Sequence, residues 1–107
     1  MKNLGNMMKQ MQDMQARMTQ AQSDIAAMQV SGVAGGGLVS VTLTGNGIVK
    51  GVKIDKSLLD PNEAEVLEDL IMAAHNDAKA KADAASAEEM KKVTGGIALP
   101  PGLKLPF

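Results

Sequence analysis

The sequence predicts an α+β fold in which two long helices flank a small antiparallel sheet. Apolar residues recur at every third or fourth position over residues 4–28, and a second segment with helical spacing covers 61–93. Between them, residues 38–54 place apolar side chains at every second position, which is the spacing of strands with one buried face. Because an isolated hairpin is marginal in water, we expect the helices to cover that face.

Residues 38–54 predict a β-hairpin with Asn46-Gly47 at its tip. This dipeptide suits a two-residue type I′ turn, in which both central residues have positive φ, and residue 45 then faces 48. A three-residue loop would place Ser40 opposite Val52, so the apolar pattern favours the shorter turn. Counting from the tip gives the pairs on each face. On the apolar face they are Val39 with Ile54, Val41 with Val52 and Leu43 with Lys50. On the polar face they are Ser40 with Lys53 and Thr42 with Gly51, and the same face carries Thr44.

The first helix is predicted at 4–29 by an unbroken heptad spacing of apolar residues. The stripe consists of Leu4, Met7, Met11, Met14, Met18, Ala21, Ile25 and Met28. We interpret it as a packing seam against a helix of the same or a second chain. An adaptable surface for another protein is the alternative, because thioether side chains repack easily.

The segment after this helix predicts a short first strand at 29–34, so the strands together cover about 29–54. Gly35-Gly36-Gly37 then turns the chain into the hairpin. The glycines of this region match neither the phosphate-binding loop G-x-x-x-x-G-K-[ST] nor the dinucleotide fingerprint G-x-G-x-x-G. We therefore interpret them as turn residues.

The second helix is predicted at 61–93, with Asp60 as its N-cap and Pro61 at its first position. Its first half is rich in Leu and Ile and suits a sheet, whereas Ala78 and Ala82 allow another backbone to approach closely. Acid–base pairs at i, i+4 are expected between Asp77 and Lys81 and between Glu88 and Lys92. The Pro-rich tail, 95–107, is expected to fold back onto the protein or to serve as a peptide for another domain.

Composition excludes several classes of function. The chain has 107 residues, no Cys, no Trp, no Tyr and one His, and it lacks nucleotide and metal motifs, so we expect no enzyme, no cofactor and no metal. It lacks an apolar run long enough to span a membrane. We expect one domain, 1–107, with a core so thin that a homodimer is required.

Five sequence segments together resemble the YbaB/EbfC family of bacterial nucleoid-associated proteins. They are MMKQMQDMQARM, GGGLVSV, VKIDKSLLD, LEDLIMAAHNDA and GGIALPPGLKLPF, and they cover nearly the whole chain. The resemblance implies an α-β-β-β-α protomer, a homodimer whose two long helices project from the sheet, binding to double-stranded DNA, and a location in the cytoplasm at the nucleoid.

Two functions remain open at this point. In the first, the homodimer binds DNA phosphates with little sequence specificity, in nucleoid organisation or gene regulation, while no membrane is involved. In the second, it is a dimeric protein–protein adaptor that uses the Met-rich helix or the Pro-rich tail. The net charge of −1 gives no global attraction to a polyanion. DNA binding would therefore depend on bases along the two helices, which are Lys2, Lys9, Arg17, Lys79, Lys81, Lys91 and Lys92.

Overall fold

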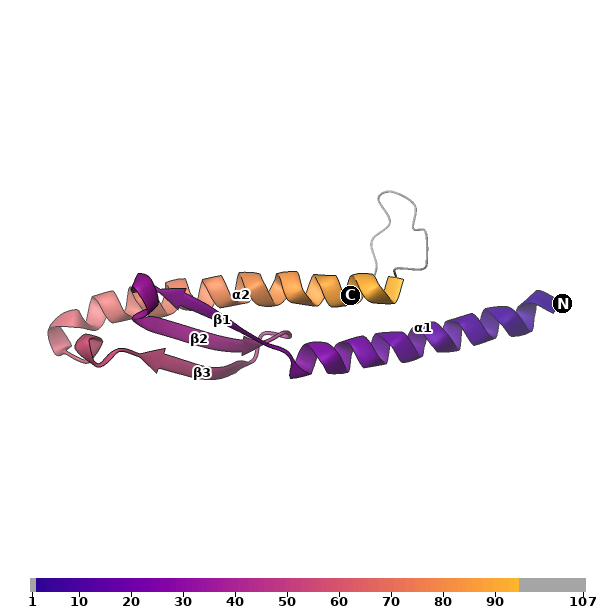
Figure 1. Ribbon diagram of the computed structural model, residues 1–107, viewed down its shortest axis with the longest axis horizontal. Helices are drawn as coiled ribbons and strands as arrows, with labels where there is room; N and C mark the ends of the chain where they lie inside the picture. The colour runs from indigo at the N-terminus through magenta and orange to yellow at the C-terminus, as the bar shows by residue number, and fades with distance from the viewer. Residues whose placement is uncertain (1, 95–107) are drawn as a thin grey trace.

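The computed structural model describes the backbone of residues 2–94 and the side chains of 4–93. The chain forms a helix, three strands and a second helix, which confirms the α+β class and the α-β-β-β-α order (Figure 1). The predicted tail, 95–107, lies outside the described residues. The elements are α1 (Lys2–Ala27), β1 (Gln29–Ala34), β2 (Val39–Thr44), β3 (Val49–Ile54) and α2 (Ala64–Thr94).

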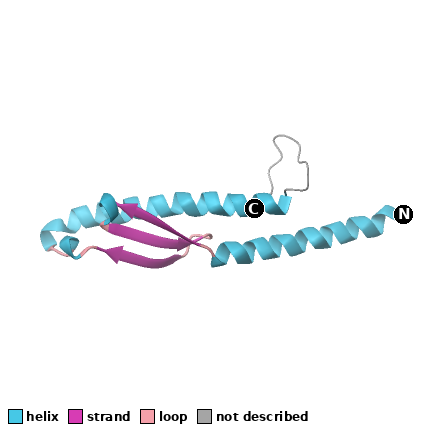
Figure 2. Cartoon of the chain, in the orientation of Figure 1, coloured by secondary structure: helices cyan, strands magenta, loops and turns pink. Residues whose placement is uncertain are grey.

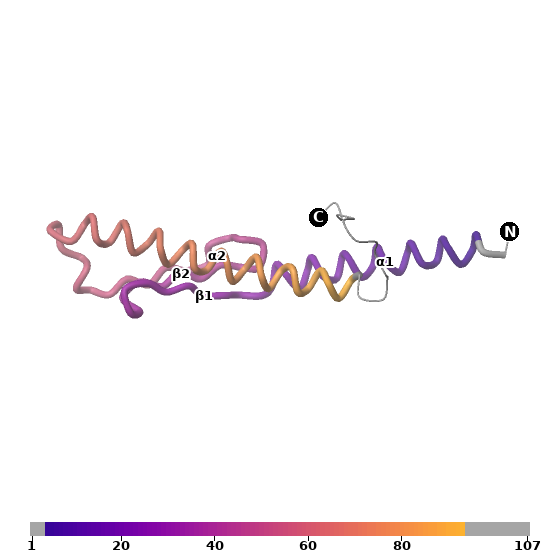
Figure 3. The backbone as a smooth tube through the Cα atoms, turned by 90° about the horizontal axis from the view of Figure 1, so that it is seen from above, coloured from indigo at the N-terminus to yellow at the C-terminus, as the bar shows by residue number. Residues whose placement is uncertain are grey.

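The three strands form one antiparallel sheet in the order β1-β2-β3. Helix α2 packs along one face of the sheet, over β1 and β2, and continues beyond it (Figure 2). Helix α1 leaves the sheet at the same end and runs antiparallel to the second half of α2, then continues past the end of α2 (Figures 1 and 3). The result is an elongated molecule of 73 × 26 × 17 Å.

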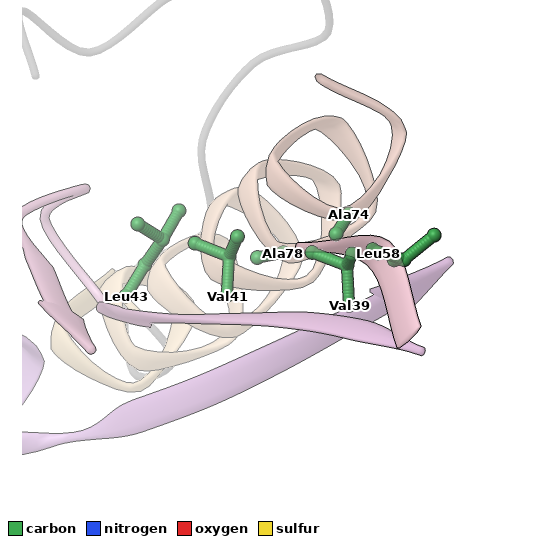
Figure 4. Packing of buried hydrophobic residues seen from close by; sticks show 6 residues of the cluster. All are labelled: Val39, Val41, Leu43, Leu58, Ala74 and Ala78. Carbon is green, nitrogen blue, oxygen red and sulfur yellow. The ribbon is translucent and has the colours of Figure 1, made fainter. Parts of the chain in front are cut away.

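The core lies between β2 and α2 (Figure 4). It exists because α2 presents a stripe of alanines, of which Ala74 and Ala78 are completely buried. Opposite them, β1 carries Gly32, where an added Cβ atom would lie 2.2 Å from the Ala74 carbonyl oxygen and 2.2 Å from the Ala78 nitrogen. The helix and strand backbones therefore touch, and only glycine fits between them. The six buried core residues are Val39, Val41, Leu43, Leu58, Ala74 and Ala78.

The end of α1 is fixed to both the hairpin and α2. The Gly45 nitrogen lies 3.1 Å from the Ile25 carbonyl oxygen and 3.2 Å from that of Met28, so the hairpin closes the last turn of α1. Ala21 and Ile25 are buried, whereas Leu4, Met7 and Met11 are exposed. The predicted seam is thus confirmed only for the part of α1 that faces α2.

The hairpin has most of the predicted pairs, although its turn differs from the predicted one. The pairs from Val39–Ile54 to Thr42–Gly51 are as predicted, but Leu43 pairs with Val49, so the predicted Leu43–Lys50 pair is wrong. The predicted two-residue type I′ turn is wrong. The loop has three residues, because the Gly47 N–H donates to the Thr44 carbonyl at 3.0 Å and the Thr44 N–H donates to the Ile48 carbonyl at 2.8 Å. Asn46 also lacks the positive φ that a type I′ turn requires. A one-residue bulge in β3 then offsets the longer loop.

Two residues of this turn test the predicted geometry. Gly47 has φ 89°, so its predicted positive φ is confirmed. Thr44 does not lie on an exposed polar face, because it is buried with 2% of its surface accessible. Its hydroxyl accepts the Ile48 N–H at 3.1 Å and bonds the Asn46 side chain, which explains why a polar residue is tolerated there.

Capping residues connect β3 to α2. The Asp55 carboxylate accepts the Ser57 N–H at 2.9 Å, which lowers the pKa of Asp55 and closes the turn Lys56–Leu58. That turn directs Leu58 into the core. The Asp60 carboxylate accepts the Asn62 N–H at 2.9 Å, so Asp60 caps the chain as predicted, although a 3₁₀ turn, Pro61–Glu63, precedes the α-helix.

The close contact at Gly32 gives the first prediction. Gly32→Ala should destabilise the protein by roughly 3 kcal/mol, because the added methyl group meets helix backbone that cannot move aside. Gly51→Ala is the matched control, since a Cβ added at Gly51 would have nothing within 4 Å. Urea denaturation followed by circular dichroism measures both, and equal losses would contradict the role given to the Gly32 contact.

Candidate nucleic-acid interface

The predicted bases are exposed but do not form one patch. Lys9 and Arg17 lie on α1, and Lys79, Lys81, Lys91 and Lys92 lie on α2, all of them exposed. Lys2 lies in the first turn of α1, and its side chain is outside the described part.

Lys79 and Lys81 lie on different sides of α2. A Cβ added at Gly47 would lie 3.9 Å from Lys79 Cε, which places Lys79 beside the β2–β3 turn. Lys81 Nζ donates instead to the Ser31 carbonyl of β1 at 2.9 Å. The structure brings Arg17 and Lys92 together, in a crevice of about 190 Å³ between α1 and α2 that Asp24 and Glu89 also line.

Each candidate base on α2 makes an ion pair within that helix. The predicted pair of Lys81 with Asp77 is confirmed at 3.2 Å. The predicted pair of Lys92 with Glu88 is wrong, because i, i+3 contacts are formed in its place. The other pairs are Lys79–Asp83 at 2.6 Å, Lys91–Glu88 at 3.2 Å and Lys92–Glu89 at 3.0 Å.

Breaking these ion pairs to bind a phosphate would cost little free energy. The four lysine side chains are 50–73% exposed, and exposed pairs typically contribute about 0–1 kcal/mol. The hydrogen bond to Glu89 raises the pKa of Lys92. Lys81 is the most constrained of the four, because it also bonds β1.

The bonds around Asp77 join α2 to β1. Its carboxylate accepts the Val33 N–H at 3.0 Å and pairs with Lys81, and these two contacts lower the pKa of Asp77, with the backbone bond contributing most. Lys81 is therefore part of a small polar clasp between helix and strand.

Three further exposed bases lie outside the two helices and were not among the predicted contacts. Lys50, Lys53 and Lys56 are exposed on β3 and in the turn after it, and none of them forms an ion pair among the side chains of residues 4–93. Lys50 lies at the β3 bulge. In the sequence, residues 32–59 carry these three lysines against one carboxylate, Asp55.

Acidic residues are concentrated at the opposite end of the molecule from α1. Residues 60–69 carry Asp60, Glu63, Glu65, Glu68 and Asp69 without a base. They lie at the start of α2, whereas α1 projects beyond the other end of the sheet (Figure 1). The bases of α1 and the second half of α2 are therefore separated from this acidic end.

An apolar surface remains open beside β3. Val49 and Val52 face the same side of the sheet as Leu43 and Val41, but they are 49% and 48% exposed because α2 lies over β1 and β2. With Ile71, Met72 and His75 they border a hollow of about 320 Å³. We call Val49, Val52, Ile71, Met72 and His75 the β3–α2 surface.

Two other kinds of arrangement are absent from the described part of the chain. Within it, His, Asp and Glu side chains form no group of three or more that could hold a metal ion. No helix there combines the length and apolar character needed to cross a bilayer.

Comparison with known proteins identifies the chain's relatives. The model of the YbaB/EbfC DNA-binding family matches residues 1–97. A nucleoid-associated protein of Rhodospirillum centenum is 61% identical, and one of Paramagnetospirillum magneticum is 63% identical, each over 107 residues and 100% of both chains. The crystal structure of the uncharacterized protein HP0035 from Helicobacter pylori has a TM-score of 0.64 and 26% identity, covering 91% of this chain and 95% of that one.

The Asp77 clasp gives the second prediction. A carboxylate with a lowered pKa stabilises the fold above the ordinary Asp value of 3.8, and this stabilisation is lost as pH falls through the lowered pKa. Asp77→Asn should therefore lower the unfolding temperature at pH 7, and the loss should shrink as the pH falls through the lowered pKa of Asp77. Asp83→Asn, whose ion pair with Lys79 stays within α2, is the control. Equal losses at pH 7 would contradict a special role for the α2–β1 contact.

Proposed function

The chain belongs to the YbaB/EbfC DNA-binding family of bacterial nucleoid-associated proteins, and from this premise we propose that it binds double-stranded DNA as a homodimer with little sequence specificity. The observation that carries the proposal is the family match over residues 1–97. The family is a DNA-binding family and not an enzyme family. We place the protein in the cytoplasm at the nucleoid, in nucleoid organisation or gene regulation.

Phosphate contacts are the proposed source of affinity. The exposed bases of α1 and α2 lie on flexible side chains, and the lysines of α2 can exchange an exposed carboxylate for a phosphate at little cost. Such contacts position a protein on DNA without reading its sequence. The proposed set remains Lys2, Lys9, Arg17, Lys79, Lys81, Lys91 and Lys92, to which we add Lys50, Lys53 and Lys56.

The β3–α2 surface is the proposed dimer interface. It is the apolar face of a sheet that one helix covers only partly, and a second copy would supply the missing cover. A two-fold contact uses the same patch on both chains, so each β3 would gain cover from its partner. Dimerisation also doubles the bases available to one duplex, which offsets the low net charge of the single chain.

A protein–protein adaptor is the second candidate function. One observation favours it, namely that Met7 and Met11 are 56% and 69% exposed on the free part of α1. Apolar side chains in such a row are typical of surfaces that bind another helix or an extended segment. DNA titration separates this candidate from the first.

The third prediction concerns DNA affinity. If four to six phosphates are engaged, the logarithm of the binding constant should fall with the logarithm of salt at a slope of about −4 to −5. Replacing Lys79 and Lys91 by Ala should weaken binding to unrelated duplexes alike and flatten the slope. Fluorescence anisotropy with two unrelated duplexes measures both effects, and absence of binding at low salt would favour the adaptor.

A charge-matched pair of acid variants sharpens this test. Asp83→Asn removes the partner of Lys79, whereas Asp69→Asn makes the same charge change at the acidic start of α2. We expect Asp83→Asn to raise DNA affinity several-fold and Asp69→Asn to raise it less. Equal gains would show that only net charge matters and would exclude this part of α2 as the contact.

The fourth prediction concerns the dimer. Val52→Glu should abolish self-association, because it places a charge in the β3–α2 surface, while Val33→Glu should not, because Val33 is half-exposed on the opposite face of the sheet. Light scattering at micromolar concentration should give about twice 11.1 kDa for the parent and for Val33→Glu. A parent protein that is a folded monomer would exclude the proposed dimer.

A further inference from the structure

The first part of α1 carries an apolar surface that α2 does not cover. Met7, Met11, Met14 and Met18 line one hollow of about 440 Å³ together with Gln10 and Gln15, and we call these six residues the Met surface. Met7 and Met11 are more than half exposed, and Met14 and Met18 are half-buried. An apolar row of this kind is costly to leave in contact with water.

The end of α2 lies at one end of this surface. Val93 is 3% exposed and lines the same crevice as Arg17 and Ala21 of α1. Ala21 is buried where α2 covers the seam, and the seam continues at Met18 where α2 ends. Thr94, the last residue of α2, therefore lies at one end of the uncovered part of the same seam (Figure 3).

We propose that the tail, 95–107, extends along the Met surface of its own chain and covers it. Length permits this arrangement. An extended tail reaches about 43 Å, whereas the helix from Met18 to Leu4 rises only about 21 Å. The Gly95-Gly96 pair directly after α2 allows the turn that the path requires.

The sequence pattern of the tail fits the spacing of the methionines. In an extended chain, alternate residues share one face and are about 6.6 Å apart, and four residues of a helix rise about 6 Å. If Ile97 lies at Met18, then Leu99 reaches Met14 and Leu103 reaches Met7. In this register, the odd positions of the tail that face the Met surface are Ile97, Leu99, Pro101 and Leu103.

Two physical terms favour the tail over another occupant. Covalent attachment gives it a high local concentration, so binding loses little translational entropy. Its prolines restrict the free chain, which lowers the entropy lost on ordering. This inference is independent of DNA binding, and it leaves the Met surface unavailable to an adaptor partner.

Disulfide trapping tests the proposal directly, because the chain has no native cysteine. Met7→Cys combined with Leu103→Cys should form an intramolecular bond under a mild oxidant and migrate as a single chain. The matched control combines Lys9→Cys with Leu103→Cys, since residue 9 lies on the opposite side of the helix from residue 7. A crosslinked product of twice 11.1 kDa, or equal trapping in the control, would overturn the proposal.

Methyl NMR tests it without altering the Met surface. Leu103→Phe should shift the methyl resonance of Met7, because it places an aromatic ring current beside that methyl group, while the methyls of Met28 and Met72 stay unchanged. An unchanged Met7 resonance would also overturn the proposal.

Discussion

Direct contact between the backbones of α2 and β1 determines how the rest of the molecule is arranged. Gly32 lacks the side chain that would hold the helix away, and Ala74 and Ala78 present the smallest apolar surface that a helix can offer. The helix is therefore fixed over β1 and β2, and the Asp77 carboxylate secures the same contact with a hydrogen bond to Val33. A helix held in this position cannot also cover β3.

The two open apolar surfaces follow from this single placement. Fixed over β1 and β2, α2 leaves Val49 and Val52 exposed, and it ends before the heptad seam of α1 does. Each opening has a proposed cover of different origin, a second chain for the β3–α2 surface and the tail for the Met surface. Under these two proposals, the small core of six residues is extended by one contact with a second chain and by one contact with the tail.

Local sequence patterns predicted the helices and strands, whereas the contacts between them could be seen only in the structure. Alternation in residues 38–54 and the heptad spacing of α1 are properties of short segments, so element order and the pairs at the core end of the hairpin follow from them. The burial of Thr44 does not, because it depends on α1 closing over the turn. For the candidate site, positions on the helices predicted which bases are exposed. They did not predict that Lys92 pairs with Glu89, because that depends on side-chain directions that residue spacing does not determine.

The hairpin shows how this protein can accommodate insertions and deletions. Compared with a two-residue turn without a bulge, this hairpin has one more residue in its loop and one more residue in β3. The two additions together leave the pairs from Val39–Ile54 to Thr42–Gly51 the same as in that simpler hairpin. A related chain could lose both residues and keep the same buried face. Loss of only one of the two residues would keep these pairs as well, because the other irregularity stays in place. A change of length at the turn therefore need not displace the core residues of either strand.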